Sequence, residues 1–229
     1  MKHIFNILLA VLVFGSASAQ MVMDKGYIKM EMTDISSNGE QSAELGMLKG
    51  AEMEVHFAGS KVLTSINLMG GMMNMSTLVD KKANKTDILI NAMGSKMWAE
   101  ETTESAKDND VSKAVEGMDV KYDESQTKEI LGYKVIKATI RRADQPGMTM
   151  EAWITEDIKI NSDFIPGMED LQLKGYPLEI TINANGTKMS IVTKDIKNVV
   201  DMNKFVLDTT GAEKIKMSDL AGMMGGMGM

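Results

Sequence analysis

Regular alternation of apolar and polar residues constrains the fold of this chain more than any other feature. Three segments alternate with a period of two: Gly26–Thr33, Ala51–Ala58 and Pro177–Ala184. Successive side chains of a β-strand point to opposite faces, so each segment predicts a strand with one buried and one wet face. Weaker patterns predict further strands at Val62–Met69, Met72–Val79, Thr86–Met93, Val120–Glu124, Tyr133–Arg142, Met148–Thr155 and Lys188–Lys194.

The connections between these segments are short, which favours an antiparallel meander in one domain. Asn185-Gly186 separates two alternating runs and is typical of a two-residue type I′ hairpin turn. Helices are expected at Gly39–Lys49 and in a last short stretch near Asp219. The acidic segment Glu100–Glu116 has few apolar residues and is expected to be a weakly anchored helix or a mobile loop.

The N-terminus predicts export. Lys2 precedes an apolar run from Ile4 to Phe14, which is too short to span a bilayer. Small residues at Ala17 and Ala19 then form a signal-peptidase site. We therefore expect a signal peptide over residues 1–19, a mature domain over 20–229 and a periplasmic or extracellular protein.

Composition excludes several classes of site. The 229 residues contain no cysteine and two histidines, of which His3 lies in the predicted leader. Thiolate metal sites, cysteine nucleophiles and multi-histidine metal sites are therefore excluded. A net charge of −7 argues against nucleic-acid binding. No G-x-S-x-G motif or phosphate-binding loop occurs, so we expect no enzyme, no catalytic residues and no cofactor.

Methionine is enriched, with 24 residues and two clusters at Met69–Met75 and Met223–Met229. Thioethers are soft ligands that suit Cu(I), and the glycine-rich tail offers Met223, Met224, Met227 and Met229. Neither cluster contains an anionic or imidazole donor, so we expect no tight binding. The alternative is that methionine fills the core or lines an adaptable apolar surface.

Several phrases resemble an exported bacterial family of unknown function, the one numbered forty-four twelve. They are Gly26–Met30, Glu129–Ala138, Trp153–Ile158, Leu173–Glu179 and the Gly/Met-rich tail. The segment around Ile130–Lys134 is also similar to the GLPGLI family, and more distantly to the LolA and LolB lipoprotein carriers. The resemblance implies a mainly β fold, in which a curved antiparallel sheet or half-open barrel has two or three helices plugging its concave face. It implies lipid handling, but brings no catalytic residues.

A curved sheet must cover its apolar face with helices or a ligand, and the predicted helices are short or poorly apolar. We therefore expect an apolar groove lined by Ile28, Met30, Met32, Met53, Val55, Phe57, Leu178, Ile180 and Ile182. The favoured function is binding of a lipid, acyl chain or acylated protein. The alternatives are an envelope protein that acts without a small ligand and a Cu(I)-handling protein. We expect no nucleic-acid partner and no transmembrane segment, and the sequence leaves the oligomeric state open.

Overall fold

The computed structural model describes residues 20–37, 45–46, 48–102, 118–142, 147–160, 173–184, 186–217 and 219–220. Two short 3₁₀ turns, η1 (Met69–Gly71) and η4 (Met202–Lys204), interrupt a chain built mainly of strands. The strands are β1 (Met21–Met23), β2 (Lys25–Ser37), β3 (Glu52–Ala58), β4 (Lys61–Leu68), β5 (Met73–Asp80), β6 (Lys85–Ala92), β7 (Ser95–Thr102), β8 (Met118–Ile130), β9 (Tyr133–Arg142), β10 (Met148–Thr155), β11 (Ile158–Ile160), β12 (Tyr176–Ala184), β13 (Thr187–Lys197) and β14 (Glu213–Lys214).

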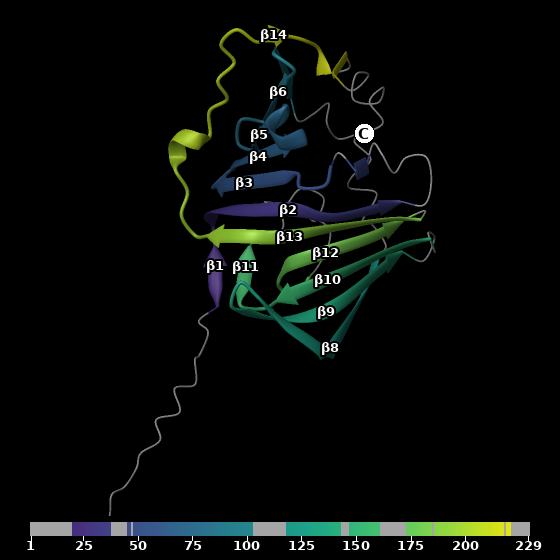
Figure 1. Ribbon diagram of the computed structural model, residues 1–229. Helices are drawn as coiled ribbons and strands as arrows, with labels where there is room; N and C mark the ends of the chain where they lie inside the picture. Colours follow the sequence, from purple (N-terminus) through teal and green to yellow (C-terminus); the bar gives the residue numbers. More distant parts are fainter. Residues whose placement is uncertain are drawn as a thin grey trace, which may run out of the picture.

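One large sheet dominates the architecture (Figure 1). Its strand order is β14-β7-β6-β5-β4-β3-β2-β13-β12-β10-β9-β8, with β14 and β8 at its two edges. All neighbours pair antiparallel except β14 with β7, and a separate parallel pair joins β1 to β11. The predicted fold class, a mainly β protein with an open antiparallel sheet, is confirmed.

The alternating segments form strands as predicted, because each has an apolar face to bury. The hairpin at position 186 also forms: β12 and β13 pair up to Ala184 and Thr187, and Gly186 has a φ of 80°. That left-handed conformation favours glycine, which has no Cβ to clash. Among the described residues no helix is long and apolar enough to cross a bilayer.

The predicted helix Glu100–Glu116 is wrong over its first three residues, which belong to β7. The Glu100 carboxylate there is matched by lysines on two other strands: Lys85 Nζ lies 2.8 Å from Glu100 Oε2, and Lys214 Nζ lies 3.6 Å from Glu100 Oε1. Cross-strand charge pairs of this kind stabilise a sheet surface, so an acidic run is compatible with a strand. The rest of that segment lies outside the described residues, as does most of Gly39–Lys49, of which Leu45 and Gly46 are helical.

The register aligns apolar side chains across six consecutive strands. Directly paired residues share a face, so one row runs along the inner side of the sheet. The row consists of Met30, Met53, Ile66, Met75, Ile90 and Met97. It continues the face predicted for β2 and β3, and it leads to the β4–β7 end of the sheet.

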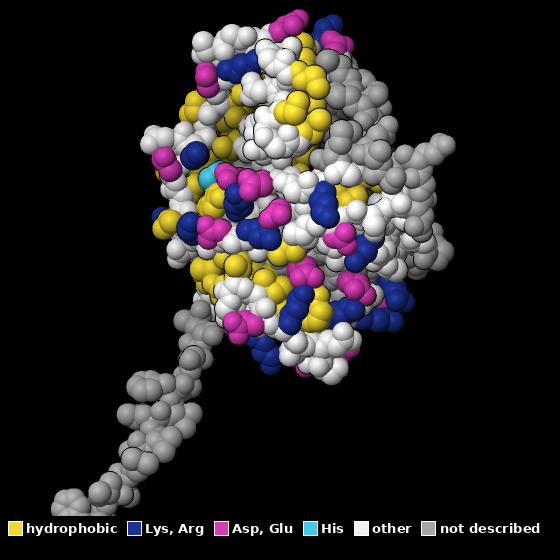
Figure 2. All heavy atoms as spheres, in the orientation of Figure 1, with side chains coloured by type: hydrophobic (Ala, Val, Ile, Leu, Met, Phe, Trp, Pro, Cys, Tyr) yellow, Lys and Arg dark blue, Asp and Glu magenta, His cyan; other side chains and the backbone are white. Residues whose placement is uncertain are grey.

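The opposite face is polar over the middle of the sheet. Figure 2 shows positive and negative side chains intermixed there, and cross-strand pairs include Lys29 with Glu52 at 2.7 Å and Lys194 with Glu31 at 3.3 Å. Nearer β5, this face is covered by the segment that follows β13: Phe205 packs on Leu63 and Leu78. The outer face thus carries cross-strand ion pairs in the middle of the sheet, and the segment after β13 covers it near β5.

Candidate ligand-binding site

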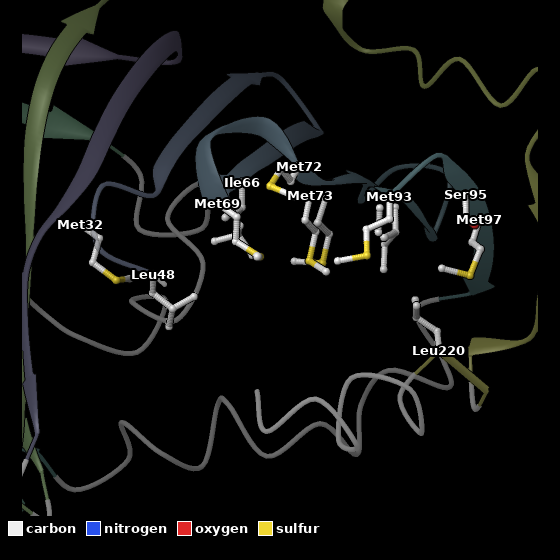
Figure 3. A pocket seen from close by; sticks show the side chains of 14 residues that line it. Met32, Leu48, Ile66, Met69, Met72, Met73, Met93, Ser95, Met97 and Leu220 are labelled. Atoms are coloured by element: carbon white, nitrogen blue, oxygen red, sulfur yellow. The ribbon is translucent and has the colours of Figure 1, made fainter. Parts of the chain in front are cut away.

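The inner face of β4–β7 borders an apolar cavity of about 510 Å³ (Figure 3). This volume falls within the range of roughly 300–1,000 Å³ that is usual for small-molecule sites. Its lining consists of Met32, Leu48, Ile66, Leu68, Met69, Met72, Met73, Met75, Ile90, Ala92, Met93, Ser95, Met97 and Leu220.

Two rows of paired residues form the floor of the cavity. The first row is the end of the apolar ladder described above, from Ile66 to Met97. The second lies two residues further along each strand and consists of Leu68, Met73, Ala92 and Ser95. It runs from large side chains on β4 and β5 to small ones on β6 and β7.

The rim is built by two chain reversals. Gly70 and Gly71 have φ values of 64° and 99°, and this left-handed backbone turns the chain between β4 and β5. As a result Met69 and Met72 flank the turn on the cavity side. Met93 occupies the β6–β7 turn, and its N–H donates to the Met72 carbonyl at 3.3 Å. Figure 3 shows Met69, Met73 and Met93 extending into the same space.

Leu48 and Leu220 contribute to the cavity from elsewhere in the chain. Leu220 is buried and packs with Ile90 and Ala99. The segment leading to it is fixed to the edge of β7, because the Ile215 N–H donates to the Trp98 carbonyl at 2.9 Å. The C-terminal segment therefore supplies a wall of the cavity.

The chemistry of the lining is uniform. Seven of the fourteen described lining residues are methionine, and none of the fourteen carries a charge. Ser95 supplies the one polar side chain among them. Such a surface offers no partner to a buried charge and gains free energy from apolar contact alone. Methionine is unbranched and polarizable, so the lining can adapt to ligands of varied shape.

The nine residues predicted to line a groove share one sheet face, and Met32 also lines the cavity. Ile28, Met30, Val55, Phe57 and Leu178 are buried in one core cluster, with Met53 packed against it. Ile180 belongs to a second cluster, with Ile182 packed against that. The structure thus places eight of the nine in or against packed core, further along the same face.

The cavity residues on β4–β7 were missed as a group because alternation identifies a face but not which part of it is left open. A local signal exists: Met69–Met75 places four methionines around a Gly-Gly turn. From the sequence alone, that cluster was a candidate copper ligand set. The predicted tail ligands Met223, Met224, Met227 and Met229, and the cleavage-site residues Ala17 and Ala19, lie outside the described residues.

Two buried titratable groups lie away from the cavity. Burial raises the pKa of Tyr176 to about 12, and its hydroxyl lies 4.0 Å from the Met30 sulfur. On the outer face, His56 is 7 % exposed and its Nδ1 has no hydrogen-bond partner. Burial lowers the pKa of His56, while Glu54, 3.6 Å from Nε2, opposes that shift. No group of three His, Cys, Asp or Glu residues in the described chain is placed to hold a metal ion.

Three solved structures show a similar chain path. An uncharacterized conserved protein from Thermus thermophilus is 8 % identical, with a TM-score of 0.49, over 87 % of this chain and 92 % of that one. The Mycobacterium tuberculosis lipoprotein LppX is 10 % identical, with a TM-score of 0.41, over 78 % and 89 %. A LolA superfamily protein from Nitrosomonas europaea is 9 % identical, with a TM-score of 0.36, over 82 % and 92 %.

No family model matches the sequence, and no curated protein matches it. The resemblance to the family numbered forty-four twelve therefore stays a prediction.

Proposed function

We propose that this protein is an exported, non-enzymatic binding module that holds an apolar ligand, such as a lipid or acyl chain, in the methionine-lined cavity. Residues 1–19 would direct its export, and the mature domain would carry the ligand in the periplasm or outside the cell. Membership of the exported family numbered forty-four twelve is part of the same proposal. The observation that supports it best is the cavity of about 510 Å³ with no charged side chain in its described lining.

The energetics favour a flexible hydrocarbon. Each methylene group removed from water contributes about 0.8 kcal/mol, so ten buried methylenes supply roughly 8 kcal/mol before the costs of ordering the chain. Polar atoms gain nothing from the apolar lining and would remain in solvent, near the exposed Ser95 at the β7 end of the floor. A single acyl chain with its head group in solvent therefore fits the chemistry of the cavity.

A second candidate, Cu(I) handling, is favoured by the seven thioethers around the same space. Soft thioethers select Cu(I), but the described lining contains no imidazole or anionic donor to strengthen such a site. Titration of the reduced protein with Cu(I) in the presence of a competing chelator tests this candidate. A one-to-one complex that survives the chelator would favour Cu(I) handling over acyl-chain binding as the function.

The acyl-chain proposal is tested by narrowing the cavity. Ala92 lines it, whereas the neighbouring Asn91 has its side chain on the opposite face of β6. We expect Ala92→Phe to weaken binding of palmitoyl lysophosphatidylcholine by about tenfold or more, since excluding two methylenes forfeits roughly 1.6 kcal/mol. Asn91→Phe is the matched control and should bind as the wild type does. Isothermal titration calorimetry measures both affinities.

Mass spectrometry of the natively exported protein provides the independent observation. A lipid or acylated species should co-purify with the wild type and be depleted in Ala92→Phe. If the wild type binds no apolar ligand in either experiment, the proposal fails and an envelope protein without a small ligand replaces it.

A further inference from the structure

Two methionines at the rim of the cavity are exposed to solvent, and a backbone hydrogen bond links them. Met72 is 58 % exposed and Met93 is 79 % exposed, and both line the cavity. The hydrogen bond between their backbones holds the two turns together at the mouth. The remaining lining methionines, Met32, Met69, Met73, Met75 and Met97, are partly buried.

We propose that Met72 and Met93 are oxidation sites at which a hydroperoxide controls ligand binding. The inference rests on the proposed function, since it concerns regulation of the same cavity. It goes further, because it assigns a modification to two named side chains and gives the cavity a dependence on oxidants.

The reaction is a two-electron oxidation of each thioether. The sulfur lone pair attacks one peroxide oxygen, the O–O bond breaks, and a sulfur–oxygen bond forms. The released hydroxide takes the proton of the transferred oxygen, so the thioether becomes a sulfoxide and hydrogen peroxide is reduced to water. Exposure governs susceptibility, so the two rim residues should react before the partly buried ones.

Oxidation changes the chemistry of the mouth. A sulfoxide is polar and chiral, whereas the thioether it replaces is apolar. A bound acyl chain that contacts the rim would then have to desolvate two sulfoxide oxygens, and no described lining residue offers a charged donor in compensation. Ligand affinity should therefore fall when the rim is oxidised and recover when the sulfoxides are reduced.

The chain provides a matched control. Met202, in η4, is 59 % exposed, which is nearly the exposure of Met72, and it does not line the cavity. Met23, Met30 and Met150 are buried in core clusters and should resist oxidation. One protein therefore shows whether the effect of oxidation depends only on a methionine being exposed or also on its position at the cavity.

The experiment treats the full exported protein with limiting hydrogen peroxide and maps sulfoxides by peptide mass spectrometry. Binding of cis-parinaric acid is then measured before oxidation, after oxidation and after both methionine sulfoxide reductases have acted. We expect sulfoxide at Met72, Met93 and Met202 first, with about tenfold weaker binding that the reductases reverse.

Substitutions show which methionines cause the loss of affinity on oxidation. Each is compared with its own reduced form, so the ratio of oxidised to reduced affinity is the readout. In Met72→Leu/Met93→Leu that ratio should approach one, whereas Met202→Leu should respond as the wild type does. Met72→Gln/Met93→Gln should bind weakly without any oxidant, because its amides imitate the polarity of the sulfoxides.

Failure of the proposed binding function and failure of the oxidation proposal give different results. If the reduced wild type binds no cis-parinaric acid, the proposed function fails. If it binds, and oxidation at both rim methionines leaves the affinity unchanged, the oxidation proposal fails while the binding function stands. Loss of binding that persists in the double leucine variant would also overturn the assignment to Met72 and Met93.

Discussion

At the scale of single residues, burial separates packed core from open cavity on one sheet face. Val55 is 1 % exposed and sits in the central cluster with Ile28 and Phe57. Ala92 lies on the same face, four strands from β2, where it lines the cavity beside the small cluster of Ile90, Ala99 and Leu220. Introducing phenylalanine should therefore affect stability differently at the two positions.

We expect Val55→Phe to destabilise the protein by about 1–3 kcal/mol, because a packed site has no room for a larger ring. Ala92→Phe should change the free energy of unfolding little, since its ring can enter the cavity. Urea denaturation of both variants measures the difference. Equal costs at the two positions would mean that the cavity is not open space in solution.

His56 gives a prediction for pH. Its folded-state pKa lies below the ordinary value of 6.5, with burial as the main cause and the nearby charge of Lys204 acting in the same direction. Glu54 and Asp201 oppose the shift. The Tyr27 ring lies beside the imidazole, with 4.9 Å between the ring centroids and a tilt of 38°.

The unfolded state therefore binds the histidine proton at higher pH than the folded state does. The contribution of His56 to stability is complete above the ordinary pKa and is lost as pH falls toward the folded value. In His56→Gln, the loss of stability between about pH 7.5 and pH 5.5 should be smaller than in the wild type. Chemical denaturation at several pH values tests this, and equal slopes would show that the ring is not buried neutral.

At the scale of elements, close packing of β2 against its neighbours depends on one glycine. A Cβ on Gly26 would clash with the Met23 side chain and would lie 2.6 Å from the Lys197 carbonyl oxygen of β13. The Met23 side chain can move away, but the Lys197 carbonyl is part of the sheet backbone and cannot move without disturbing β13.

Gly26→Ala should therefore cost about 1–3 kcal/mol. The control is Gly46→Ala, where no described atom outside the adjacent residues lies within 4 Å of the new Cβ. There, loss of backbone freedom in the unfolded chain should stabilise the protein by roughly 0.4–1 kcal/mol. Thermal melting compares the two. A neutral Gly26→Ala would show that β2 and β13 are further apart than the structure places them.

Strand positions could be predicted from the sequence because alternation and turn residues act locally. Pro177–Ala184 and the turn before Gly186 became β12 and its hairpin for that reason. β7 was missed because its acidic residues do not alternate with apolar ones, and the lysines that pair with Glu100 come from β6 and β14. The cavity could not be predicted for a similar reason: it depends on long-range contacts, since Leu48 and Leu220 line it from segments far apart in the chain.

At the scale of the whole molecule, the sheet uses one face for two purposes. Around β2, β3 and β12 the apolar face is filled by core clusters. At β4–β7 it borders a cavity lined by methionine. The two parts belong to one continuous hydrogen-bonded sheet, so the packed part can fix the geometry of the strands that border the proposed ligand site.

The central claim is that an apolar ligand occupies this cavity, and methionine methyl groups report on it directly. The protein is labelled at its methionine methyls, the signals are assigned by single Met→Leu variants, and palmitoyl lysophosphatidylcholine is added during nuclear magnetic resonance. We predict shifts for Met73, Met75 and Met97, with Met23 and Met150 unchanged in the packed core. Shifts confined to methionines away from the cavity, or no shifts at saturating ligand, would contradict the account.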